Sequence, residues 1–153
     1  MALIQRDFIL RMIEAIAAAI ARIRKRRESG DLVGARSEVH NAIVDVLGPA
    51  AAMVGMLDSR TAANVVSDPT RLSMWARLLH EDSELLREMK RTAEADAIER
   101  RVLELLLEVW KREKAFDEET QKLYTLVSSR VPATALDAGF RAIQSELSAA
   151  LQG

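Results

Sequence analysis

The chain has 153 residues, the usual length of one domain, and 49% of them are hydrophobic while only 4% are aromatic. A net charge of −1 argues against a general nucleic-acid binder, and the lack of cysteine excludes disulfides, Cys-ligated metals and a thiol nucleophile. With six Gly, three Pro and no long alternation of polar and apolar residues, the sequence predicts an all-α protein.

The first predicted helix runs from Leu3 to Arg27. Its apolar residues recur at helical spacing on one arc: Ile9, Met12, Ile13, Ile16, Ile20 and Ile23. Small alanines flank this arc, so we expect neighbours on more than one side and a central place in the bundle. Charges at Arg6, Asp7 and Arg11 interrupt the apolar run, which disfavours an export signal or a membrane span.

A second helix is predicted from Leu32 to Leu47, antiparallel to the first. Gly30 can take the left-handed conformation that ends a helix, and Asp31 can cap the next one. Gly48-Pro49 ends this second helix.

The middle of the chain predicts two further helical segments. Residues 50–66 favour a short helix that breaks near Asp58-Ser59. Asp68 is a good N-cap and Pro69 suits the first helical position, so a longer helix begins there and runs to about Arg91.

Thr92 to Asp96 allows either a turn or a continuous helix, and the turn is the preferred interpretation because the segment is polar. From Ala97 an apolar face continues for about 30 residues, with a bend expected near Phe116-Asp117. Val131-Pro132 ends it, and a final short helix follows. The sequence thus predicts one domain over residues 1–153, an antiparallel bundle of about five to seven helices.

The segment from Gly30 to Ala35, followed by Val39 and Ala42, resembles the turn and second helix of a tetratricopeptide unit. Aligning Ile98, Val102 and Leu105 with Ala35, Val39 and Ala42 suggests a second copy at an offset of 63 residues. That offset is nearer two such repeats, of about 34 residues each, than one. The alternative is that any amphipathic helical hairpin produces this spacing.

The opening residues 5–13 also resemble the start of a small, uncharacterised bacterial family of tetratricopeptide-like helical proteins, with the Gly30-Asp31 turn in the matching place. The resemblance lies mainly in residues 5–47. It implies tetratricopeptide-like helical hairpins and carries no known activity or catalytic residue.

No familiar catalytic or cofactor motif is present in the sequence. His80 and Glu84 lie one helical turn apart and could chelate a metal, but Arg77 stands where a Glu-x-x-His motif needs its glutamate. No serine lies in a nucleophile motif, and no phosphate-binding glycine loop occurs. We therefore expect no metal, no cofactor and no enzymatic activity.

Two stretches are candidate interaction surfaces. The basic run at the end of the first helix contains Arg22, Arg24, Lys25 and Arg26. It can complement the helix dipole and pair with carboxylates, or it can contact an anionic membrane. The helix from Ala97 has more apolar residues than one neighbour can cover: Leu103, Leu106, Leu107 and Trp110.

These features favour a cytoplasmic, non-catalytic helical module for protein–protein interaction or self-association. A protein partner or a homo-oligomer is expected, and no nucleic acid. The first alternative is a peripheral module that binds anionic membrane surfaces. The second is an enzyme or small-ligand-binding protein whose site assembles from distant residues.

Overall fold

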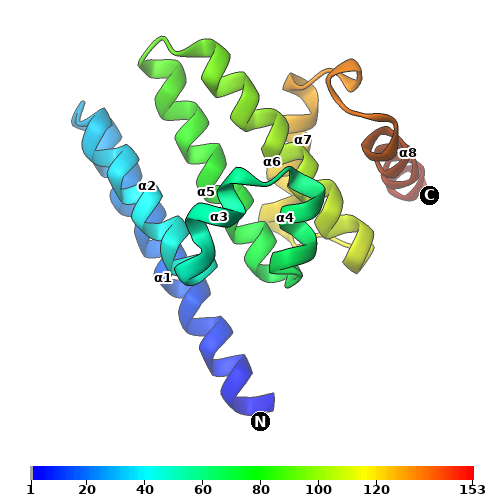
Figure 1. Ribbon diagram of the computed structural model, residues 1–153, viewed down its shortest axis with the longest axis horizontal. Coiled ribbons are helices and arrows are strands. Elements are labelled where there is room, and N and C mark those ends of the chain that lie inside the picture. The colour runs from blue at the N-terminus through cyan, green and yellow to red at the C-terminus, as the bar shows by residue number, and fades with distance from the viewer. Residues whose placement is uncertain (1) are drawn as a thin grey trace.

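The computed structural model describes residues 2–153, with side chains from Arg6 onward, so Met1 lies outside the described residues (Figure 1). This part of the chain is 87% helical and contains no strand, which confirms the all-α helical bundle. The helices are α1 Ala2–Glu28, α2 Leu32–Leu47, α3 Ala51–Met56, α4 Ser59–Val66, α5 Pro69–Glu88, α6 Thr92–Glu113, α7 Glu118–Arg130 and α8 Ala138–Gln152. Two 3-10 turns, Gly48–Ala50 and Ala133–Ala135, precede α3 and α8.

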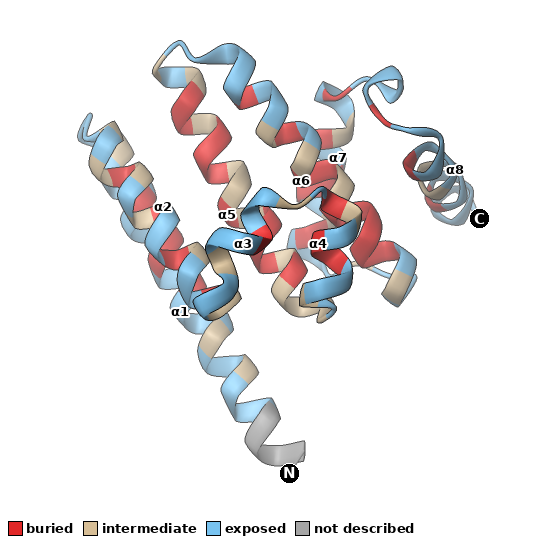
Figure 2. Cartoon of the chain, in the orientation of Figure 1, coloured by how far each residue is buried: buried red, intermediate tan, exposed pale blue. Residues whose placement is uncertain are grey.

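The antiparallel pair α5 and α6 forms the centre of the bundle. Residues 105–110 of α6 are all buried, because α4, α5, α7 and α8 pack around this helix. On the other side of α5, the α1–α2 hairpin packs mainly through α2. Figure 2 shows the buried positions concentrated on α5 and α6.

The expected central place of α1 was wrong. Only one stripe of α1 is buried, formed by Ile16, Ala19, Ile20 and Ile23, whereas Ala17, Ala18 and Ala21 face solvent. Small side chains permit a close neighbour but bury too little apolar area to require one. The helix therefore lies at the edge of the bundle.

Buried carboxylates of α5 hold the α1–α2 hairpin in place. Arg24 of α1 donates to Glu81 Oε1 at 2.8 Å, and Arg36 of α2 donates to Asp82 Oδ1 at 2.8 Å. Both carboxylate side chains are almost fully covered. Buried charges are tolerated when they are paired and hydrogen-bonded, so these contacts fix where the hairpin docks.

Aspartate caps begin five of the helices. Each carboxylate accepts a backbone N–H of the first turn: Asp31 from Gly34, Asp58 from Thr61, Asp68 from Thr70, Asp117 from Thr120 and Asp137 from Phe140. The caps at Asp31 and Asp68 agree with the sequence prediction. The observed bounds of α2 also match the predicted ones.

The turn expected at Thr92–Asp96 lies three residues earlier, at Met89–Arg91. Lys90 takes a left-handed backbone with φ 64°, its N–H donates to Arg87 O at 3.0 Å, and Arg91 N–H donates to Leu86 O at 2.9 Å. Thr92 to Asp96 instead form the first turns of α6. The prediction missed this turn because no glycine marks it.

A turn of the same geometry joins α1 to α2. It changes the offset between the two copies of the suggested repeat. Gly30 occupies the position of Lys90, so the two hairpins correspond at an offset of 60 residues and not 63. Ala95 then matches Ala35, and both are fully buried. A small residue at this point lets the two helices of each hairpin approach closely.

The long helix expected from Ala97 is two helices. α6 ends at Glu113, Lys114 is left-handed with φ 55°, and Asp117 caps α7. The expected bend near Phe116-Asp117 is therefore a complete break. After Val131-Pro132, α8 packs against α6 through buried residues that include Phe140 and Leu147.

Candidate functional surfaces and clefts

The basic run at the end of α1 is exposed but largely paired. Its arginines contact carboxylates of the α1–α2 connection, of α2 and of α5. The pairs are Arg22 with Glu38, Arg24 with Glu81, Arg26 with Asp31 and Glu38, and Arg27 with Glu84 and Glu88. Lys25 makes no ion pair with a described residue. The run therefore presents far less net positive charge than its sequence suggests.

The second predicted surface does not exist. Leu103, Leu106 and Leu107 are fully buried and Trp110 is only 6% exposed. Several helices surround α6, and together they cover these side chains, which one neighbouring helix could not do. The apolar residues of the helix from Ala97 are thus core residues.

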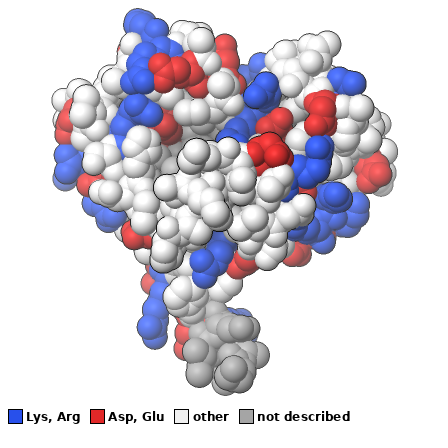
Figure 3. Space-filling view, viewed as in Figure 1, with Lys and Arg blue, Asp and Glu red and all other residues white. Residues whose placement is uncertain are grey.

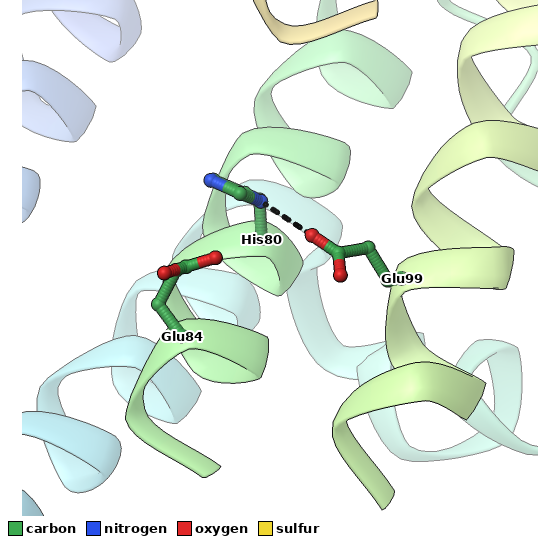
Figure 4. A group of neighbouring side chains, drawn as sticks. All are labelled: His80, Glu84 and Glu99. Carbon is green, nitrogen blue, oxygen red and sulfur yellow. Dashed lines mark ion pairs between the residues drawn. The ribbon is translucent and has the colours of Figure 1, made fainter. Parts of the chain in front are cut away.

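A buried ion-pair cluster joins α5, α6 and α7, and Figure 4 draws three of its members, His80, Glu84 and Glu99. Glu99 of α6 is 1% exposed and accepts hydrogen bonds from Arg87 of α5 and Arg130 of α7. His80 Nδ1 lies 3.4 Å from Glu99 Oε1, and Arg130 also donates to Glu84 at 2.5 Å. Burial raises the pKa of Glu99, but the nearby His80 and the hydrogen bonds from Arg87 and Arg130 outweigh it and lower that pKa to about 2.

The same cluster resembles a metal site in its donor types. Ligand atoms of His80, Glu84 and Glu99 all lie within 4.8 Å of one another, so the structure adds Glu99 to the pair seen in the sequence. No sequence spacing could have found Glu99, because it comes from a different helix. A divalent cation could bind here only by displacing Arg87 and Arg130, so the cluster acts as a structural clamp.

The surface over α3 and α4 carries few charges (Figure 3). Large apolar side chains are exposed at the end of α2 and on α3: Val44, Met53 and Met56. Met56 is the most open of these, at 87%. Arg101 of α6 donates to Leu57 O at 2.8 Å and to Val54 O at 3.3 Å, which anchors the end of this short helix.

By length and hydropathy, the stretch Leu32–Met56 could cross a membrane, with a mean hydropathy of 1.3. In the structure this stretch comprises α2, the 3-10 turn Gly48–Ala50 and α3. Gly48 has a positive φ of 76°, which interrupts the helix between its two parts.

The N-terminal part of α1 extends past its partner helix (Figure 1). α1 has 27 residues and α2 has 16, so α2 ends before it can cover the start of α1. Phe8, Leu10 and Ile13 are exposed on this overhang. Because α3 begins where α2 ends, the overhang and α3 lie at the same end of the hairpin, and we call Phe8, Leu10, Ile13, Val44, Met53 and Met56 the apolar end.

Besides an open cleft of about 390 Å³ between Arg60, Lys111 and the start of α8, two clefts are large enough for small molecules. One, of about 510 Å³, lies among α4, α6 and Asp137, and its polar groups are mostly paired: Ser59 donates to Glu104, and Arg60 to Asp137. The other, of about 380 Å³, lies between the first half of α5, the end of α6 and the start of α7. Neither holds a recognisable catalytic arrangement of side chains.

Comparison with family models, curated proteins and solved structures finds no match to this chain.

Proposed function

We propose that the chain is a non-catalytic helical module that works by protein–protein contact, with another protein or with a second copy of itself. The observation that carries this proposal is the apolar end. Exposed side chains there come from two neighbouring parts of the fold, the overhang of α1 and the α2–α3 corner. Large apolar side chains that are exposed at one end of a fold are a common feature of binding surfaces.

The chemistry of the apolar end suits a helical or apolar partner surface. Met53 and Met56 have flexible, polarizable side chains that adapt to different shapes. The overhang of α1 is an amphipathic helix: Asp7, Arg11 and Glu14 lie opposite the stripe that contains Ile13, and the exposed Phe8 and Leu10 lie on the two flanks between them. A partner that covers the apolar stripe leaves these charges in water, which avoids a desolvation cost.

The resemblance to tetratricopeptide-like bacterial proteins fits this proposal. Two hairpins with the same turn, at Gly30 and Lys90, and the same buried alanine, Ala35 and Ala95, support a relationship between the two halves. Helical hairpin repeats commonly serve as binding scaffolds. A cytoplasmic location belongs to the same proposal and is compatible with the lack of cysteine.

Binding to anionic membranes is the weaker candidate. The composition of Leu32–Met56 favours it, but the pairing of Arg24, Arg26 and Arg27 removes most of the charge that would attract lipid headgroups. Sedimentation with anionic vesicles at low salt tests this alternative directly. If the protein sediments with these vesicles and Lys25→Gln abolishes the sedimentation, the membrane would be favoured over a protein partner.

The main test compares two exposed apolar positions, Met56 inside the apolar end and Val33 outside it, at 87% and 74% exposure. Met56→Glu should weaken self-association or partner capture about tenfold, while Val33→Glu should leave both unchanged. Light scattering with size exclusion measures the first, and chemical crosslinking in lysate the second. A monomer whose crosslinks are insensitive to Met56→Glu would refute the proposal.

A further inference from the structure

The cleft of about 380 Å³ has an apolar floor, a polar wall from α5 and further polar groups from the end of α6 and the start of α7. Met74, Val109 and Phe116 form the floor, with Ile13 of α1 at one side. The wall is a single face of α5, since Thr70, Ser73 and Arg77 are three and four residues apart. Thr120 of α7, itself 2% exposed, lines the same cleft. The volume is near the lower end of the usual range for small-molecule sites, about 300 to 1,000 Å³.

Arg77 differs from the other half-buried arginines of the chain. Each of the others pairs with a carboxylate or donates to a backbone carbonyl: Arg27, Arg36, Arg60, Arg71, Arg87, Arg101 and Arg112. Arg77 makes no hydrogen bond or ion pair with any described residue, yet it lines this cleft and a smaller neighbouring one. A partly desolvated guanidinium without a described protein partner readily donates hydrogen bonds to an anionic ligand group.

A carboxylate also lines the cleft without a partner among the described residues. Glu113, at the end of α6, makes no ion pair, and none joins it to Arg77. Asp117 lines the cleft as well, but its Oδ1 accepts the Thr120 N–H at 2.7 Å as the cap of α7. The cleft thus offers one free positive group and one free negative group above an apolar floor.

We infer that this cleft binds a small zwitterion with an apolar body, that is, a free α-amino acid with an apolar side chain. Its carboxylate pairs with Arg77 and its ammonium group with Glu113. Its side chain packs on Met74, Val109 and Phe116. A simple organic anion fits less well, because Glu113 and Asp117 repel it, and a simple amine is repelled by Arg77.

The test uses three probes that differ in one charge each: L-phenylalanine, 3-phenylpropionate, which lacks the ammonium group, and phenethylamine, which lacks the carboxylate. Amide chemical shifts in the full chain, followed by NMR, report binding at Ser73 and Thr120. We expect saturable shifts with L-phenylalanine and at least about tenfold weaker binding of the two other probes.

Arg77→Gln should weaken binding of L-phenylalanine about tenfold or more. Glu113→Gln should weaken it too, while it improves binding of 3-phenylpropionate. Arg11→Gln, an exposed arginine that lines none of these clefts, is the matched control and should bind like the unchanged chain. Ser73→Val narrows the cleft without changing a charge and should also weaken binding of L-phenylalanine. It replaces Arg77→Gln as the test variant if Arg77→Gln fails to fold.

Failure of L-phenylalanine and L-leucine to produce saturable shifts would overturn the inference. Equal binding by Arg77→Gln and the unchanged chain would overturn it as well. The proposed protein–protein role does not depend on this result, since the apolar end and the cleft are tested by different variants.

Discussion

Gly30 and Lys90 occupy the same left-handed position, at the ends of α1 and α5, with φ of 84° and 64°. In both turns the residue's own N–H donates to a carbonyl three residues back at 3.0 Å, and the next N–H donates five residues back at 2.9 Å. Glycine adopts this conformation freely, whereas a side chain with a Cβ is strained there. The two helical hairpins therefore share a turn that their sequences encode differently.

Replacing Lys90 with glycine should stabilise the protein. Relief of the left-handed strain should raise the free energy of unfolding by about 1 kcal/mol. Gly30→Ala should lower it by a similar amount: the added Cβ has room, since it meets no atom within 4 Å, but alanine is strained in the left-handed conformation. Urea unfolding measures both changes. Lys111→Gly, inside α6, is the control and should destabilise by about 1 kcal/mol. Destabilisation by Lys90→Gly would contradict the assigned turn.

Glu99→Gln should destabilise the bundle by about 3 kcal/mol, because it leaves Arg87 and Arg130 without their buried counter-charge. The amide has nearly the same shape, so packing is preserved and the lost charge dominates. Thermal or urea unfolding provides the measurement. The matched variant Glu94→Gln removes an exposed partner of Arg91 and should change stability by less than about 0.5 kcal/mol.

Stability should fall as the solution is acidified. The pKa of Glu99 is about 2 in the fold against 4.5 ordinarily, so its contribution is complete above pH 4.5 and is lost as the pH falls towards 2. The shift corresponds to about 3 kcal/mol at most. Urea midpoints measured across this range should decline less steeply in Glu99→Gln than in the unchanged chain. Parallel pH profiles would show that other carboxylates are responsible.

Ile20→Asp should unfold the domain, since Ile20 is 6% exposed and an unpaired carboxylate there has no partner. The expected loss is about 4 kcal/mol or more, visible as loss of the cooperative transition by circular dichroism. Ile16→Asp should behave alike. Lys25→Gln and Arg26→Gln change exposed residues of the same helix and should leave the transition within a few degrees.

The sequence by itself determined the all-α class and those helix starts that have a local capping signal. Asp31, Asp68 and Pro69 act through neighbours in the chain, so capping and the proline ring decide where α2 and α5 begin regardless of the rest of the fold. The turn at Lys90 escaped prediction for the converse reason, since it is imposed on a residue with no preference for it.

Only the tertiary structure decided which apolar faces are covered and which charges are paired. Leu107 and Phe8 are both large apolar residues of helices, yet Leu107 is fully buried among the helices around α6, whereas Phe8 stays exposed with only the end of the Arg71 side chain over its ring. Glu99 meets Arg87 and Arg130 across three helices, whereas Arg77 makes no ion pair with a carboxylate of the described residues. Such relationships depend on how helices dock, which periodicity within one helix does not specify.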